Sequence, residues 1–250
     1  MTEEWEIKAR VKGTTTVRND RSLVLDSVKE HGADFSGRKL DYFCAITSRF
    51  EKCRFEKLSI SDACFGGGTS DSEYYDCSFD SSKIASGAPG HAKFVHCSFR
   101  NVLIRELCCH EVQFISCVFS GRFLSGYFNG SVLEERAGHR KRNEFRGNDF
   151  SQMEFVDVAF RTGIDLTLQK LPTGPNYLYL PDAPSAVAKV RRQVIEWTDL
   201  DLRKNGMIVI QLLEGELQGG QQQLFLSTKV PPPPKLRKAK EVIFKMLGQV

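Results

Sequence analysis

Cysteine and histidine are the residues of this chain whose types and spacing could bind a metal ion or attack a substrate. The 250 residues include eight cysteines and five histidines, and Cys108, Cys109 and His110 are consecutive. Thiolate and imidazole ligands bind zinc, and a thiolate beside an imidazole can act as a nucleophile. The sequence has no paired CxxC motif of the zinc-ribbon type, and the other histidines are scattered. The role of the cysteines must therefore follow from their positions.

Motifs for other kinds of catalysis are absent from the sequence. It contains no GxxxxGK[ST] phosphate loop and no GxGxxG, HExxH or GxSxG motif. Glu134 and Glu135 are adjacent, so their carboxylates point in different directions, and the glycines 66–68 are followed by no lysine. The sequence therefore predicts a protein that is not an enzyme and that uses no metal or cofactor.

A five-residue repeat occupies the middle of the chain and explains most of the cysteines. From Ala33 onward, a bulky apolar residue recurs at almost every fifth position, and the residue two positions before it is often small. The expected core consists of Phe35, Leu40, Phe50, Phe55, Ile60, Phe65, Phe79, Ile84, Phe94, Phe99, Ile104, Phe114, Phe119, Leu124, Phe145, Phe150, Phe155 and Phe160, with Cys53, Cys77, Cys97 and Cys117 at the small positions.

A period of five fits neither a helix, which repeats near 3.6 residues, nor a flat strand, which repeats every two. It fits a coil whose sides are five residues long. The pairs Cys77–Phe79, Cys97–Phe99 and Cys117–Phe119 recur every 20 residues, so four sides make one turn. Buried cysteine packs as a small apolar residue. A column of disulfides or metal ligands is the alternative, and no histidine or carboxylate alternates with these cysteines to favour it.

The repeat resembles that of the pentapeptide-repeat family, in a variant rich in Cys and Phe. The segments ADFSG at 33–37 and GNDFS at 147–151 are closest to the A(D/N)LXX unit of that family, and the resemblance covers residues 33–166. It implies a mainly β fold, a right-handed quadrilateral β-helix or solenoid. It also implies one possible function, because some family members resemble duplex DNA and bind type II topoisomerases such as gyrase.

The chain outside the repeat divides into a cap, two insertions and a C-terminal region. Residues 1–32 are expected to cap the first coil with a strand over 5–11 and a short helix over 20–29, and insertions are expected near 66–69 and 127–142. Residues 167–250 are expected to form a helical docking region. Its first helix would begin at Ser185 and stop at Gly206. Residues 207–217 could be helix or strand, the prolines 231–234 form a stiff spacer, and the last residues form a basic amphipathic helix.

Positive charge gathers in two places, although the net charge of the whole chain is only +4. Arg136, Arg140, Lys141 and Arg142 lie in the second insertion and could contact an anion or nucleic acid. A solvated loop or a loop that contacts a partner protein are the alternatives. The basic C-terminal helix could likewise serve docking or dimerisation, nucleic-acid binding or contact with a membrane surface.

These observations favour a scaffold that presents a rigid rod to a protein partner, with a homodimer through the C-terminal region as one possible assembly. Two alternatives stay open: a DNA mimic that protects a topoisomerase, which needs a continuous acidic face, and a nucleic-acid binder. An enzyme would need a deep pocket at the junction of the rod with the C-terminal region. The sequence contains neither an apolar run long enough to span a membrane nor a signal peptide, which predicts a cytoplasmic protein.

Overall fold

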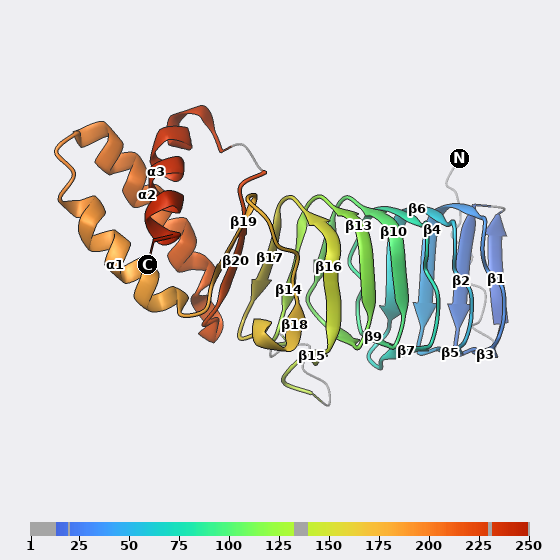
Figure 1. Ribbon diagram of the computed structural model, residues 1–250. Coiled ribbons are helices and arrows are strands. Elements are labelled where there is room, and N and C mark those ends of the chain that lie inside the picture. Colours follow the sequence, from blue (N-terminus) through green and yellow to red (C-terminus); the bar gives the residue numbers. More distant parts are fainter. Residues whose placement is uncertain (1–13, 20, 133–139, 230–231, 250) are drawn as a thin grey trace, which may run out of the picture.

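A stack of short parallel strands forms most of the molecule, and three helices follow at its C-terminal end (Figure 1). This computed structural model describes residues 14–19, 21–132, 140–229 and 232–249. The strands form a solenoid of about seven turns, which confirms the mainly β solenoid expected from the repeat. Among the described residues, no helix is both long enough and apolar enough to cross a membrane.

The solenoid strands belong to three sheets. The first contains β1 (Thr14–Asn19), β2 (Ser22–Asp26), β4 (Lys39–Ile46), β6 (Ser59–Gly67), β8 (Lys83–Gly87), β10 (Ser98–Ile104), β13 (Val118–Phe123), β16 (Asn148–Phe155) and β18 (Gln169–Lys170). The second contains β3 (Lys29–His31), β5 (Arg49–Glu51), β7 (Ser72–Tyr75), β9 (Ala92–Val95), β12 (Val112–Ile115) and β15 (Phe145–Arg146). The third contains β11 (Leu107–Cys109), β14 (Gly126–Asn129) and β17 (Val158–Arg161). All their pairings are parallel except that of β1 with β2.

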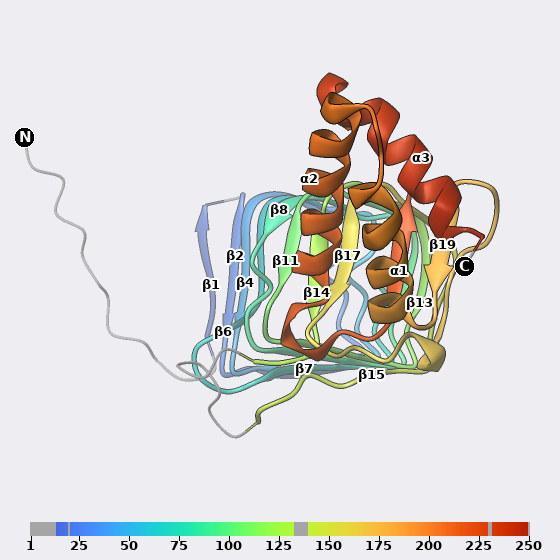
Figure 2. The same ribbon diagram turned by 90° about the vertical axis from the view of Figure 1, so that its left-hand side faces the viewer.

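Each central coil has four sides, as the 20-residue spacing predicts. In one coil, β5 forms a side, Arg54 forms the next through isolated bridges to Asp34 and Ser78, and the long strand β6 forms the remaining two. Ile60 pairs on the first part of β6, and Ala63 pairs on the second part. The sides therefore enclose one interior that runs the length of the rod (Figure 2).

Stacked aromatic rings fill that interior. One column runs through Phe35, Phe55, Phe79, Phe99, Phe119 and Phe150, and neighbouring rings lie 4.5–4.9 Å apart. A second column runs through Phe50, Tyr74, Phe94 and Phe114 at 4.6–5.0 Å. These separations match the spacing of hydrogen-bonded strands, so each coil places its ring directly on the ring of the coil before. Burial of each ring stabilises the fold by about 1.5–3 kcal/mol.

The repeated cysteines lie inside the solenoid beside the aromatic columns. Cys53, Cys77, Cys97 and Cys117 are buried, and all eight cysteines of the chain are free. The Cys77 sulfur lies 3.5 Å from the carbonyl oxygen of Phe50 in the preceding coil and 3.3 Å from that of Tyr75, so its single hydrogen has two acceptors within reach. At this position of the later coil, Asn148 replaces cysteine and donates to the carbonyl of Phe114 at 2.8 Å. The column thus consists of small side chains that hydrogen-bond to backbone carbonyls.

One expected core residue, Leu124, is only half-buried, because the repeat loses one residue before it. Phe123 occupies the inward position instead, is 1% exposed and pairs with Phe155 of the next coil. The chain makes this shortened corner at Gly121, where φ is +105° and a Cβ atom would lie 2.2 Å from the carbonyl oxygen of Val102. Glycine is therefore required at this approach. All the other expected core residues are buried.

The structure expected for the N-terminal cap, residues 1–32, needs correction. The short helix expected over 20–29 is wrong: residues 22–26 form β2, and 29–31 form β3. Leu23 and Leu25 alternate inward, and Leu23 pairs with Phe43 of β4, so this segment already belongs to the solenoid. The strand expected over 5–11 lies outside the described residues.

The insertions also differ from expectation. β6 continues through Gly67, so the first insertion leaves the coil only after that residue. β14 belongs to the coil and pairs with β17, so the second insertion begins after Asn129 rather than at residue 127.

Left-handed corners recur at one position of successive coils. Lys52, Asp76, His96 and Ser116 each have a φ between 52° and 55° and directly precede the buried cysteines. This conformation costs a side-chain-bearing residue roughly 1–2 kcal/mol and costs glycine much less.

We expect Lys52→Gly to raise the free energy of unfolding by about 0.5–1 kcal/mol in urea denaturation. Lys83→Gly, at an exposed strand position, is expected to lower it by a similar amount. If Lys52→Gly lowered the free energy of unfolding as much as Lys83→Gly does, the left-handed geometry of the corner would be contradicted.

A two-stranded antiparallel sheet and a three-helix bundle follow the last coil. The sheet pairs β19 (Tyr177–Leu180) with β20 (Leu224–Ser227), and the helices are α1 (Ala183–Ile195), α2 (Leu200–Glu216) and α3 (Arg237–Leu247). Short 3-10 turns occur at η2 (Leu166–Leu168), η3 (Gln218–Gly220) and η4 (Pro234–Leu236). The expected C-terminal amphipathic helix is present as α3, with Ile243 and Leu247 buried.

The single helix expected over 185–206 is in fact two helices. Asp182, not Ser185, caps α1, because its carboxylate accepts the amide proton of Ser185. Gly206 does not stop a helix but lies buried inside α2, where a Cβ atom would come within 2.8 Å of Val194 and Trp197. Residues 207–216, for which helix and strand were both open, continue α2.

Candidate functional site

The two-stranded β19–β20 sheet attaches the helical region to the end of its own solenoid. Phe225 of β20 is buried within the solenoid core, where its ring stacks on Tyr177 at 5.1 Å and meets Phe155 edge-on at 6.0 Å. The amide of Phe155 donates to the Tyr177 hydroxyl at 3.1 Å, and the Ser227 hydroxyl donates to the carbonyl of Phe155 at 3.0 Å. The C-terminal region therefore closes the last coil within the same chain.

Gln221 completes this closure and is only 1% exposed. Its amide oxygen accepts hydrogen bonds from the backbone amides of Gly163 and Ile164, both at 3.0 Å. Its amide nitrogen donates to the carbonyls of Ile164 at 3.0 Å and Gln223 at 2.8 Å. One side chain thus satisfies the backbone groups that the next coil would otherwise have paired.

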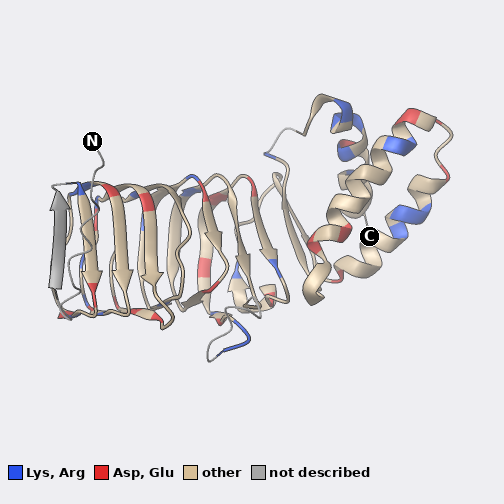
Figure 3. Cartoon of the chain, turned by 180° about the vertical axis from the view of Figure 1, so that it is seen from behind, with Lys and Arg blue, Asp and Glu red and all other residues tan. Residues whose placement is uncertain are grey.

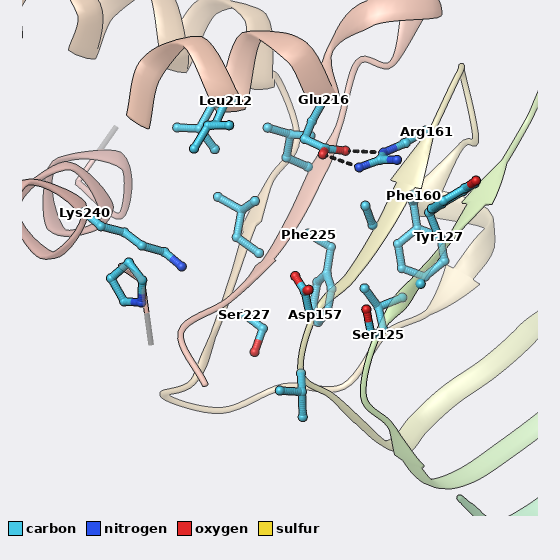
Figure 4. A pocket seen from close by; sticks show the side chains of 18 of the residues that line it. Ser125, Tyr127, Asp157, Phe160, Arg161, Leu212, Glu216, Phe225, Ser227 and Lys240 are labelled. Carbon is cyan, nitrogen blue, oxygen red and sulfur yellow. Dashed lines mark hydrogen bonds and ion pairs between the residues drawn. The ribbon is translucent and has the colours of Figure 1, made fainter. Parts of the chain in front are cut away.

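An apolar groove of about 580 Å³ lies where the solenoid meets the helices (Figure 4). β14, β17 and β20 form its floor, and α2 and α3 form its walls with the prolines at 232 and 233. Residues that line it include Ala159, Leu212, Leu213, Leu226, Leu236 and Phe244. Leu212 lies at the lip of the groove and is 62% exposed. The volume is in the range of sites that bind small molecules or peptide side chains.

The charged groups in the groove face charges of opposite sign. Arg161 on β17 donates two hydrogen bonds of 2.6 Å to the carboxylate of Glu216 on α2, and the Arg161 pKa is raised by this hydrogen bonding. Burial lowers the pKa of Lys240 on α3, and the nearby charge of Asp157 partly offsets that effect. The Lys240 ammonium also lies 5.1 Å from the centre of the Phe244 ring. The groove therefore holds balanced pairs of charges on an apolar background.

The Cys108–Cys109–His110 sequence does not form a metal site. Cys109 belongs to the solenoid core and is fully buried, whereas Cys108 lines the groove. The His110 ring contacts the hydroxyl of Tyr127 through Nε2 at 2.5 Å and the amide nitrogen of Asn129 through Nδ1 at 3.2 Å. Burial raises the pKa of Tyr127 to about 12. The described part of the chain contains no group of three potential metal ligands.

This arrangement leaves His110 poorly placed to act as a base. Because the Asn129 amide nitrogen can only donate, Nδ1 of His110 accepts its proton, and Nε2 carries the hydrogen that Tyr127 accepts. The basic nitrogen of the ring is therefore occupied. A nucleophilic cysteine needs a free base within hydrogen-bond reach, and no hydrogen bond joins Cys108 to His110 among the described residues.

The expected basic site in the second insertion is not assembled. Arg140 is largely buried, forms an ion pair with Asp71 and donates to the carbonyl of Glu111. Arg142 donates to the carbonyl of Gly163 at 2.6 Å, and Lys141 is exposed. Arg136 lies outside the described residues. Arg140 therefore ties the second insertion to the end of the first and is not available to bind an external anion.

The surface of the rod carries charges of both signs (Figure 3). Several opposite charges form ion pairs between successive coils. Examples are Arg49 with Glu73 at 2.9 Å and Lys170 with Asp149 at 3.0 Å. Each acidic residue of the cluster after the first insertion has a basic or histidine neighbour: Asp71 with Arg140, Glu73 with Arg49, Asp76 with His96 and Asp80 with Arg100. A DNA mimic needs a continuous negative face. The mixed charge gives the topoisomerase alternative no support.

Neither the residues of the groove nor the closure of the last coil by Phe225 and Gln221 was predicted from the sequence. The groove joins residues 108–161 to residues 209–244, which no local pattern connects. Comparison of the chain with known protein families, with characterised proteins and with solved structures found no match, so the resemblance to the pentapeptide-repeat family stays a prediction.

Proposed function

We propose that this protein is a non-enzymatic interaction scaffold whose solenoid and C-terminal bundle together form a groove that binds a partner protein. The observation that carries the proposal is the apolar groove with the exposed Leu212 at its lip. Apolar residues at the centre of an open site provide most of the affinity of protein interfaces. A segment of a partner that covers Leu212 would remove this side chain from water.

The groove lies where an enzyme interpretation required a pocket, so its polar groups bear on that alternative. Arg161 and Glu216 bind each other. His110 does not line the groove but contacts the groove residue Tyr127, and hydrogen bonds engage both of its ring nitrogens. A catalytic site instead needs a free base and a substrate-facing acid or nucleophile in mutual reach. The groups that line this groove favour binding over catalysis.

Two leucines on one helix allow a matched test of the proposal. Leu212 and Leu200 both belong to α2 and are 62% and 66% exposed, but only Leu212 lines the groove. We expect Leu212→Asp to lose, and Leu200→Asp to keep, the proteins that the wild-type chain retains from a native lysate. Quantitative mass spectrometry of the retained proteins provides the measurement. Equal retention by the two full-length variants would contradict the proposal.

A further inference from the structure

Two cysteines outside the repeated cysteine positions lie side by side on the outer face of the solenoid. Cys44 of β4 and Cys64 of β6 are register partners in adjacent parallel strands. The residues on both sides of each cysteine belong to the core: Phe43, Ala45, Ala63 and Phe65. Because side chains alternate between the two faces of a strand, both cysteines point away from the core. Two successive coils therefore place one thiol directly beside the other.

The spacing of these two cysteines suits a disulfide bond. Paired strands lie about 4.7–4.9 Å apart, and a disulfide joins Cα atoms that are about 4.4–6.8 Å apart. The two thiols are already in contact, because Cys64 hydrogen-bonds to Cys44, and this bond together with burial raises the pKa of Cys64. The hydroxyl of Tyr42 also hydrogen-bonds to Cys44. The fold thus brings the two sulfur atoms together without any movement of the coils.

The two thiols differ in their access to solvent. Cys64 is partly exposed, whereas Cys44 is only 4% exposed. The start of the first insertion lies against Cys44, since a Cβ atom on Gly67 would lie 3.1 Å from its sulfur. A dissolved reagent can therefore meet Cys64, while Cys44 is shielded from the reagent but stays in contact with Cys64.

The other six cysteines lack this combination of access and a neighbouring thiol. All eight cysteines lie in the described part of the chain, and none of them forms a disulfide. Five of the six are buried in the core: Cys53, Cys77, Cys97, Cys109 and Cys117. Cys108 is partly exposed, but its register partner on β14 is Tyr127. Cys64 is thus the partly exposed cysteine that has a second thiol as its register partner.

From this geometry, we propose that Cys44 and Cys64 are a reversible oxidation site, which forms an intramolecular disulfide with a low-molecular-weight disulfide such as oxidised glutathione as the oxidant. The Cys64 thiolate attacks one sulfur of the oxidant, forms a mixed disulfide and releases one glutathione thiolate. The Cys44 thiolate then attacks the Cys64 sulfur and releases the second glutathione thiolate. The two protein thiols lose two protons and two electrons, and the oxidant gains both to become two molecules of reduced glutathione.

The environment of the pair determines how the reaction proceeds. A protonated thiol is a poor nucleophile, so the raised pKa of Cys64 makes the first attack the slow step. The second step is fast, because Cys44 already lies against Cys64. The product closes a loop of about 20 residues and joins two successive coils, which restricts the unfolded chain. The oxidised protein should therefore resist urea better than the reduced protein.

Mass spectrometry of the full-length native protein tests the inference. The protein would be incubated with oxidised glutathione, quenched with acid, denatured, alkylated and digested without a reductant. Trypsin cleaves after Arg49, between the two cysteines, and cleavage after Glu73 separates Cys64 from Cys77. We expect the intact mass to fall by two hydrogen atoms and one cross-linked peptide pair to contain Cys44 and Cys64. Dithiothreitol should reverse both changes.

Two single variants are matched controls for the order of the steps. Cys44→Ser removes the second thiol, so we expect the mixed disulfide with glutathione to accumulate at Cys64. Cys64→Ser leaves only the shielded thiol of the pair, so we expect no glutathione at Cys44 and no cross-link. Circular dichroism would verify that both variants are folded.

Several outcomes would overturn the inference. They are the absence of any reaction, a mixed disulfide that persists at Cys64 in the wild type, and oxidation of the buried pair Cys77 and Cys97 as fast as that of Cys44 and Cys64. A lower urea midpoint for the oxidised protein would also overturn it, because the bond would then strain the coils. None of these residues lines the groove, so the inference and the proposed function stand or fall separately.

Discussion

Replacement of Phe79 by alanine is expected to lower the free energy of unfolding by about 3–5 kcal/mol. The Phe79 ring is 1% exposed and stacks on Phe55 at 4.9 Å and on Phe99 at 4.8 Å. Its loss would leave a cavity between two coils. The backbone hydrogen bonds fix the spacing of these coils, so the neighbouring rings could not move together to fill the cavity. Urea denaturation followed by circular dichroism measures the change, and Phe79→Leu provides a milder variant if Phe79→Ala does not fold.

The matched control for this prediction uses two neighbouring residues. Phe123→Ala is expected to cost about 3–5 kcal/mol, because Phe123 points into the solenoid. Leu124→Ala is expected to cost about 1 kcal/mol or less, because Leu124 is only half-buried. The strict five-residue period would predict the reverse order. A larger loss at Leu124 than at Phe123 would contradict the shortened corner at Gly121.

The second large effect is expected where Gln221 closes the last coil: Gln221→Ala should lower the free energy of unfolding by about 3 kcal/mol. The truncation leaves the amides of Gly163 and Ile164 and the carbonyl of Ile164 without this partner. Each buried polar group that loses its hydrogen bond costs roughly 1–3 kcal/mol, and partial access of water reduces the sum. Urea denaturation provides the measurement.

Gln222 is the control for Gln221, because it is adjacent and exposed. We expect Gln222→Ala to change stability by less than about 0.5 kcal/mol. Hydrogen exchange adds a local readout: the amides of Gly163 and Ile164 should exchange faster in Gln221→Ala and at the wild-type rate in Gln222→Ala. Equal stability and equal exchange in the two variants would show that Gln221 does not cap the solenoid.

The solenoid was predictable from the sequence, because its interior depends on a pattern that repeats. Phe79, Phe99 and Phe119 have equivalent positions in successive coils, so one geometric rule accounts for all of them. The same rule misplaced Leu124, because the loss of one residue at a corner shifts every later position until the next insertion. The strand β2 was missed because it precedes the first recognisable repeat unit, although it pairs with β4 in the same parallel way as the later strands pair.

The candidate site was not predictable in the same way, because it forms between segments that share no periodicity. Leu212 and Phe225 are both apolar residues of the C-terminal region, yet one is exposed at the groove and the other is buried in the solenoid core. Only the break between α1 and α2 and the return of β20 to the last coil distinguish them. Arg140 shows the converse: a basic run suggested an external ligand, but the fold supplies Asp71 as its partner.

The cap and the groove depend on the same contacts. Phe225 and Gln221 fix β20 against the last coil, and Arg161 holds α2 through Glu216. Removal of residues 167–250 would therefore expose the end of the solenoid as well as remove the groove. Point variants such as Leu212→Asp separate binding from stability, whereas deletion of the region does not.

Photo-crosslinking in cells that naturally produce the protein tests the central claim, which is that the groove contacts a partner protein. A photoreactive amino acid would replace Leu212 in the groove, Leu200 on the same helix or Lys83 on the face of the rod, one site at a time. The account predicts one discrete cross-linked product from position 212 and none from positions 200 and 83. A product from position 83 alone, or equal products from 212 and 200, would contradict it.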